Sequence, residues 1–197
     1  MKLKSIALLF SFFIMLNMAF AQKSNFSPVN TKHNIKFGIN TFFNEDEFVL
    51  GVSWEFKIAN RQSIQLELSP KLYKDNYSKR NGIAFAASYR KYISKNKEGL
   101  QGIYLSPMIK YGVLNENYTG YGFRKSISND FNAALLFGKQ WVFKSGFSLD
   151  INGGVGLFNS KYVSTNTDPY GIPRTYTTRD NNYGITPNFN LKVGYAF

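Results

Sequence analysis

The chain has 197 residues, no cysteine, one histidine, an aromatic share of 17% and a formal net charge of +12. The aromatic share excludes a disordered chain, and the missing cysteines exclude a disulfide scaffold, a thiolate metal site and a lipid-modified cysteine anchor. The positive charge is spread over several segments instead of one face, so we expect no nucleic-acid partner.

Residues 1–21 have the pattern of a secretory signal peptide. A short basic start precedes an apolar run over 6–16, and the small residues Ala19 and Ala21 stand before the expected cleavage point. The run is about half the roughly 20 residues that a membrane-spanning helix needs. We therefore expect an exported protein, with 22–33 as a short periplasmic N-terminal segment.

From residue 34 onward apolar and polar side chains alternate with a period of two, which is typical of strands and not of helices. This alternation predicts eight strands, over 34–42, 48–58, 63–72, 83–93, 102–113, 130–143, 147–157 and 185–197. The connections at 59–62, 94–101 and 144–146 are short or medium, whereas 74–82, 115–129 and 159–184 are long and polar. Short turns at one end and longer loops at the other predict an all-β fold, an eight-stranded antiparallel up-and-down transmembrane β-barrel over 34–197.

Two barrels fit eight alternating strands, and they differ in which face is apolar. A soluble barrel holds its apolar face inward around a small ligand, and a membrane barrel turns it outward. The apolar faces carry more large side chains than an eight-stranded interior can hold, so we expect them to point outward. Aromatic residues such as Trp54 and Trp141 lie near strand ends, as is typical at a membrane interface. Lys91 and Lys139 lie on the apolar face near the expected periplasmic ends of their strands, where a long side chain can extend its ammonium group to the lipid headgroups.

Three prolines interrupt the predicted strands. Pro70 and Pro187 fall near the expected outer rim, whereas Pro107 is nearer the middle of its strand. Because proline has no N–H to donate to the ladder, we expect a bulge at Pro107.

The C-terminal strand resembles the assembly signal of bacterial outer-membrane β-barrel proteins. Its alternating residues are Phe189, Leu191, Val193, Tyr195 and Phe197. More broadly the chain resembles small, OmpX-sized eight-stranded outer-membrane barrels, and 135–150 is similar to uncharacterised outer-membrane barrels of Bacteroidota. The resemblance implies a bacterial outer-membrane location, with periplasmic termini and extracellular long loops. It also implies contact with the barrel-insertion machinery and with outer-membrane lipid and lipopolysaccharide.

The polar faces carry charged residues that need partners inside a barrel. The predicted interior polar plug consists of Glu55, Glu67, Arg90, Asp150 and Lys192. Adjacent strands suggest pairing of Glu67 with Arg90, of Asp150 with Lys192, and of Glu55 with Lys36 or Lys57. Eight strands leave no open aqueous lumen, which excludes a general porin. A narrow ion path and a pocket for a small polar ligand stay open as alternatives.

Catalytic and metal sites find little support in the sequence. Hydrolysis by a serine nucleophile needs a histidine base, and His33 is expected at the periplasmic end as an exposed residue. The acidic residues Glu45, Asp46 and Glu47 are the nearest candidate for a carboxylate-only site, or else form a solvated turn or bridge divalent cations to lipopolysaccharide. We expect no enzyme activity, no cofactor and no metal.

The segment 159–184 carries the best indication of function. Its candidate contact residues are Tyr162, Tyr170, Arg174, Tyr176 and Arg179. Tyrosine and arginine among small polar residues are typical of adaptable contact surfaces, although the segment equally fits a loop that contacts only water and sugars. We therefore expect a non-enzymatic barrel with an unknown extracellular partner. A barrel that binds or passes a small amphiphile or ion, through its interior or a lateral opening near Pro107, and a lipid-modifying enzyme are the alternatives.

Overall fold

The computed structural model describes residues 31–41, 48–74, 77–94, 99–118, 123–167 and 175–197. These residues form eight strands: β1 (His33–Thr41), β2 (Phe48–Ala59), β3 (Gln62–Lys74), β4 (Ser78–Tyr92), β5 (Gly102–Tyr118), β6 (Phe123–Val142), β7 (Phe147–Thr167) and β8 (Thr175–Ala196). The expected signal peptide, 1–21, lies outside the described residues. In the described ranges no helix is both long and apolar enough to cross a membrane.

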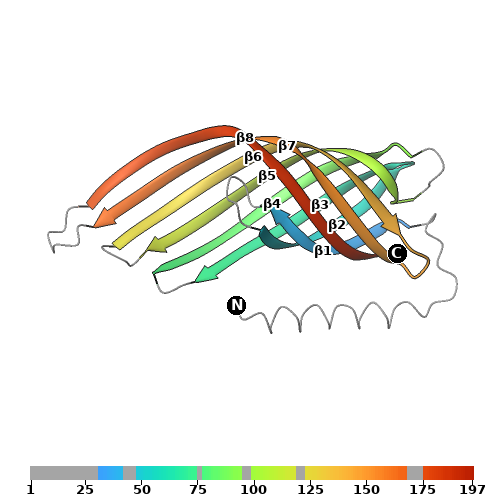
Figure 1. Ribbon diagram of the computed structural model, residues 1–197, viewed down its shortest axis with the longest axis horizontal. Helices are drawn as coiled ribbons and strands as arrows, with labels where there is room; N and C mark the ends of the chain where they lie inside the picture. Colours follow the sequence, from blue (N-terminus) through green and yellow to red (C-terminus); the bar gives the residue numbers. More distant parts are fainter. Residues whose placement is uncertain (1–30, 42–47, 75–76, 95–98, 119–122, 168–174) are drawn as a thin grey trace.

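Each strand pairs antiparallel with the next, and β1 pairs with β8 to close the barrel (Figure 1). The strand order around the ring is the order along the chain. The predicted all-β, eight-stranded up-and-down barrel is therefore confirmed.

The two faces of the wall differ in the way that the alternation predicts. In β5 the side chains of Tyr104, Ser106 and Lys110 are buried inside the barrel, whereas Leu105 and Ile109 between them are exposed outside. The same alternation runs through β6 and β7. The polar face thus lines the interior and the apolar face covers the outer wall.

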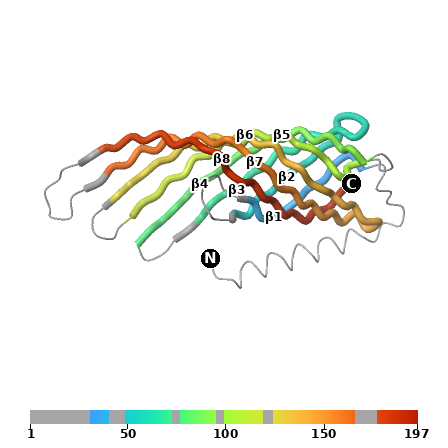
Figure 2. Tube along the Cα trace, turned by 45° about the horizontal axis from the view of Figure 1, so that its top comes forward, coloured from blue at the N-terminus to red at the C-terminus, as the bar shows by residue number. Residues whose placement is uncertain are grey.

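The strands are unequal in length, which the sequence did not predict. β1 has 9 residues, whereas β6, β7 and β8 have 20, 21 and 22, and β5 to β8 extend far beyond β1 on one side (Figure 2). Most of 74–82, 115–129 and 159–184, expected as loops, is strand, so those three predictions were wrong. The segments 115–129 and 159–184 consist largely of Ser, Thr, Asn and Tyr, so their alternation produces no apolar face. Their strand character is evident only from the backbone pairing in the structure.

The expected bulge at Pro107 is absent. Pro107 pairs in register with Leu135 of β6. On the side that faces β4, the register of the β4–β5 pairing is the same before and after the proline. Only Tyr89 and Arg90 of β4 are left without a pairing partner on β5. Pro70 of β3 lies beyond the last residue of β3 that pairs with β2, and Pro187 of β8 lies beyond the last residue of β8 that pairs with β1. On those two sides the missing N–H groups therefore break no pairing.

Aromatic rings gather at the end of the barrel that holds the C-terminus. His33 lies between Trp54 and Phe197, with ring centroids 5.8 and 5.6 Å away, and Trp54 contacts Phe56 at 5.3 Å. His33 is therefore half-buried in an aromatic cluster, not exposed as expected. On the outer wall, the exposed Lys139 places its Nζ 4.7 Å from the ring centroid of Trp141.

Candidate functional site

The barrel interior contains a buried ionic cluster, formed by Lys36, Glu55, Arg90 and Asp150. The Nζ atom of Lys36 on β1 lies 2.6 Å from Oε2 of Glu55 and 2.9 Å from Oδ2 of Asp150. It also donates to the side-chain oxygens of Gln65 and Gln140, at 2.9 and 2.6 Å. One ammonium group thereby links strands β1, β2, β3, β6 and β7.

Arg90 of β4 belongs to the same cluster. Its Nη1 atom lies 2.8 Å from Oδ2 of Asp150 and 3.5 Å from Oε2 of Glu55. Its guanidinium carbon also lies 4.3 Å from the ring centroid of Tyr104. The cluster therefore holds two cations and two carboxylates, and its formal charges cancel.

Two tyrosines complete the hydrogen bonding of the carboxylates. The Tyr92 hydroxyl donates to Oε1 of Glu55 at 2.6 Å, and the Tyr104 hydroxyl donates to Oδ1 of Asp150 at 2.6 Å. Ser63 also donates to Oε1 of Glu55, at 2.5 Å. Removing charges from water is costly unless they are paired and hydrogen-bonded, and the carboxylates of Glu55 and Asp150 meet both conditions.

A second charged layer lies beside this cluster. Lys192 of β8 forms an ion pair with Glu67 of β3, and Ser69 donates to Oε1 of Glu67 at 3.1 Å. Lys110 of β5 interacts electrostatically with both Glu67 and Lys192. This layer contains one carboxylate and two ammonium groups.

The five predicted plug residues all lie inside the barrel, but two of the predicted pairs were wrong. Glu55 pairs with Lys36 as expected, whereas Glu67 pairs with Lys192 and Asp150 pairs with Lys36 and Arg90. The long side chains reach across the narrow interior to non-adjacent strands. The prediction considered only neighbouring strands, so it missed these contacts.

The sequence prediction also omitted Gln140, Tyr92 and Tyr104 from the plug. Each of them is almost fully buried. Tyr92 is two residues from Arg90, and Tyr104 is on the same face as Lys110, so strand alternation places them inward. Strand alternation alone therefore carried the signal for both tyrosines.

The extended parts of β4 to β7 also carry polar contacts. Oδ2 of Asp130 accepts a hydrogen bond from Ser128 at 2.9 Å, and Ser160 donates to its Oδ1. Arg80 pairs with Glu116 at 2.7 Å, and each of these two side chains is about a quarter to a third exposed.

Three of the predicted loop-contact residues lie on strands. Tyr162 is in β7 and Arg179 in β8, and the Tyr162 hydroxyl is hydrogen-bonded to Arg124 of β6. Tyr176 lies in β8 opposite Asn166, and Tyr170 and Arg174 lie outside the described residues. The predicted contact surface is thus, where described, the end of a long hairpin.

The predicted assembly-signal residues share the outward face of β8. Phe189 and Phe197 are exposed, and Val193 and Tyr195 are half-buried. Leu191 also points outward. The carbonyl oxygen of Phe197 accepts backbone hydrogen bonds from Lys32 and His33, at 3.0 and 2.9 Å, so the last residue fastens β8 to the start of β1.

The described part of the chain holds no grouping of the side chains that bind metal ions most often. There, no three histidine or acidic residues are grouped so that they could hold a metal ion. The acidic candidates Glu45, Asp46 and Glu47 lie outside the described residues.

These features define a class: a closed eight-stranded β-barrel with an apolar outer wall and a charged, hydrogen-bonded interior. No protein-family model, curated protein or solved structure matches the chain.

Proposed function

We propose that this protein is a non-enzymatic bacterial outer-membrane β-barrel that is closed inside and presents long hairpins to an extracellular partner. One observation carries the membrane location, namely that the wall is apolar outside and charged inside. Ile109, Leu135 and Phe137 on the outer wall are 57, 51 and 57% exposed, whereas Lys36 and Glu55 inside have no exposed surface.

Water is an unfavourable surrounding for such a wall. Soluble monomers rarely expose contiguous apolar patches larger than a few hundred Å², and here exposed apolar side chains occur on all eight strands. A closed barrel also pairs its backbone groups between strands, which hydrocarbon demands. Lipid is therefore the surrounding that the outer face of the wall favours.

The proposed orientation follows from the ends of the barrel. The connections at 59–62 and 143–146 are tight turns on the side of the C-terminus, and the extended hairpins point the other way. Outer-membrane barrels have short periplasmic turns and longer extracellular segments. We place the outward face of β8 against the barrel-insertion machinery during assembly, and the wall against outer-membrane lipid and lipopolysaccharide.

The buried ionic cluster supports a closed interior. Lys36, Glu55, Arg90 and Asp150 bond one another across the barrel with almost no exposed surface. The expected result is a barrel without steady ion conductance.

The experiment that tests the proposal is cell fractionation followed by electrophoresis of unboiled and boiled samples. Closed membrane barrels resist detergent until heated, so we expect the protein in the outer-membrane fraction with a mobility shift on boiling. Planar-bilayer recordings of the same preparation should show no discrete conductance steps. Soluble periplasmic protein without a shift contradicts the membrane location, and regular conductance steps contradict the closed interior.

A further inference from the structure

The outward face of the barrel differs from side to side at the end that holds the C-terminus. One side carries the ring cluster of His33, Trp54 and Phe197. The side formed by β4 to β6 carries two exposed lysines instead, Lys91 and Lys139. Within the described strands, these two are the charged residues on the outward face at this end.

The two lysines lie on either side of β5. Lys91 of β4 is opposite Leu105, and Lys139 of β6 is opposite Ile103, the next outward residue of β5 toward the C-terminal end of the barrel. Two strand spacings of about 4.8 Å separate β4 from β6. Long side chains from both strands can therefore extend over the same stretch of β5.

The stagger of the ring brings both lysines to one depth of the wall. Followed from strand to strand, the pairing that starts at Asn34 of β1 reaches Thr186 of β8, whereas Asn34 itself pairs with Ala196, ten residues further along β8. A closed sheet distributes such a stagger over its strands, so a step of two strands accounts for about two to three residues. This offset matches the two-residue difference between Lys91 and Lys139.

The protein does not neutralise these two ammonium groups. Within the described residues Lys91 and Lys139 form no ion pair, and Nζ of Lys139 lies 4.7 Å from the ring centroid of Trp141. Gln62 of β3 is directly opposite Lys91, and its Oε1 accepts a hydrogen bond from the Tyr89 hydroxyl at 2.8 Å. With this oxygen occupied, Gln62 offers its amide N–H groups to an acceptor. The donors at this place therefore favour an anion.

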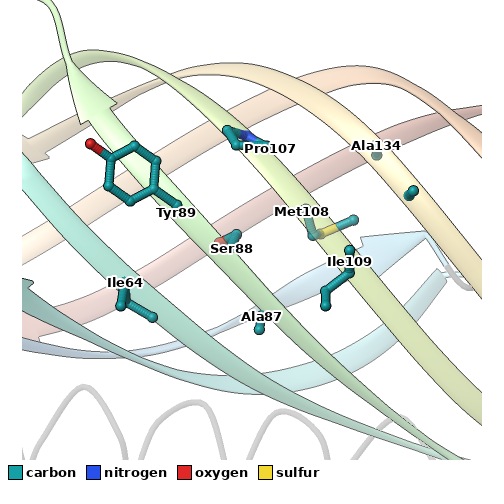
Figure 3. Close-up of a pocket in the computed structure, with 9 residues that line it drawn as sticks. Ile64, Ala87, Ser88, Tyr89, Pro107, Met108, Ile109 and Ala134 are labelled. Atoms are coloured by element: carbon teal, nitrogen blue, oxygen red, sulfur yellow. The ribbon is translucent and has the colours of Figure 1, made fainter.

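An open apolar hollow of about 600 Å³ begins beside the lysines and extends toward the middle of the outer wall (Figure 3). Tyr89, the outward residue next to Lys91 on β4, belongs to its lining. The outward residues that line the hollow come from β3 to β6: Ile64, Ala87, Tyr89, Pro107, Ile109 and Ala133. The hollow is thus a depression in the lipid-facing side of the wall, with positive charge at one end.

We propose that Lys91, Lys139 and Gln62 bind the phosphate headgroup of an anionic phospholipid, such as phosphatidylglycerol, and that one acyl chain of this lipid lies in the hollow. This inference rests on the proposed membrane location and orientation. Lipid must face the wall, and the C-terminal end of the barrel must lie at the periplasmic leaflet.

The chemistry of the site favours this ligand over others. Ammonium groups form charge-assisted hydrogen bonds with phosphate. Two ammonium groups without a carboxylate favour a headgroup with a net negative charge over a zwitterionic one, as lysines near a membrane surface attract anionic lipid. An apolar hollow that starts at the lysines adds contacts for hydrocarbon, so a phosphate that carries an acyl chain is bound better than a free anion.

The experiment uses the mature protein in phosphatidylcholine nanodiscs, with a small fraction of phosphatidylglycerol that carries a photoreactive acyl chain. We expect saturable labelling that maps to β4, β5 and β6, and much weaker labelling by a photoreactive phosphatidylcholine. Unlabelled phosphatidylglycerol should compete, and inorganic phosphate should not. Labelling that rises without saturation, or spreads evenly around the wall, overturns the proposal, and competition by inorganic phosphate overturns the lipid as the ligand.

The headgroup part of the site is tested by combining Lys91→Gln with Lys139→Gln. This double variant should weaken phosphatidylglycerol binding by about tenfold, which corresponds to about 1.4 kcal/mol. Its matched control combines Lys32→Gln with Lys144→Gln, which removes two exposed lysines from the same end of the barrel but outside the site. Equal losses for the two double variants would show a general attraction of anionic lipid and overturn the site.

The acyl-chain part is tested by Ala133→Phe, which fills the hollow from the outer wall and should reduce labelling at β4 to β6. Val155→Phe adds a phenyl ring to an outward position on β7 away from the hollow, and it should be labelled like the unchanged protein. Equal labelling of these two variants overturns the assignment of the hollow.

Each variant is first checked for the mobility shift on boiling, so that loss of binding is measured on a folded barrel. An unchanged protein that shifts but is not labelled refutes this site alone. Loss of membrane location in the unchanged protein refutes the proposed function.

Discussion

Ion pairs of the same chemical kinds occur in two different surroundings in this barrel. In the ionic cluster, Asp150 bonds Lys36 and Arg90, and these side chains have at most 2% of their surface exposed. In the extended part of the barrel, Arg80 pairs with Glu116 at 29 and 26% exposure. Burial, and not the distance between the charges, decides how much the fold depends on a pair.

The largest effect is expected for Asp150→Asn. It leaves Lys36 and Arg90 with Glu55 as the remaining carboxylate of the cluster, and breaking a buried pair costs about 3–5 kcal/mol. Equilibrium unfolding in urea with lipid vesicles measures this loss.

The control for that change is Glu116→Gln, which removes a carboxylate from the partly exposed pair with Arg80. A pair of this kind contributes about 0–1 kcal/mol. Similar losses for the two variants would show that burial does not distinguish the two regions.

A smaller effect is expected from Gly138→Ala in β6. The added Cβ would lie 2.5 Å from the Cβ of Asn152 and 2.7 Å from the ring of Tyr104. That ring cannot move freely because its hydroxyl bonds Asp150. We expect a loss of about 1–3 kcal/mol of unfolding free energy, typical of overpacking.

The matched control is Gly153→Ala on the adjacent β7. There the nearest atom to the added Cβ is the carbonyl oxygen of Asn188, at 3.5 Å, which is an ordinary contact. Its unfolding free energy should stay nearly unchanged. A loss as large as that of Gly138→Ala would mean that crowding at Tyr104 is not the cause.

The smallest effect on the barrel is expected from shortening the β7–β8 hairpin. Tyr162 and Asp180 are directly opposite each other, so a two-residue asparagine–glycine turn can replace 163–179. The ionic cluster is far along the strands, so the mobility shift on boiling should persist. Binding to bacterial or host surfaces should fall if this hairpin is the contact surface, and unchanged binding would contradict that role.

Much of the fold could be predicted from the sequence, because strand alternation is a local property. The period of two placed Glu55, Arg90 and Lys192 inside and Phe189 outside, and the structure agrees. The ends of β6, β7 and β8 were missed, since polar residues alternating with polar residues carry no such signal. Nothing local distinguishes a long polar hairpin from a long polar loop.

The ionic cluster was predicted only in part for a different reason. The pair of Lys36 with Glu55 joins neighbouring strands and was foreseen, whereas Lys192 with Glu67 crosses from β8 to β3. Contacts across the interior depend on how the closed sheet is staggered and how narrow it is. These are properties of the whole ring.

The sequence by itself determined the number of strands, the two faces of the wall and the positions of the prolines. Only the tertiary structure decided which charges meet, and that Pro107 opens the ladder toward β4 without shifting its register. The physical reason is that side-chain direction is set residue by residue along a strand. The partner of an inward charge and the integrity of the wall are set when all eight strands close.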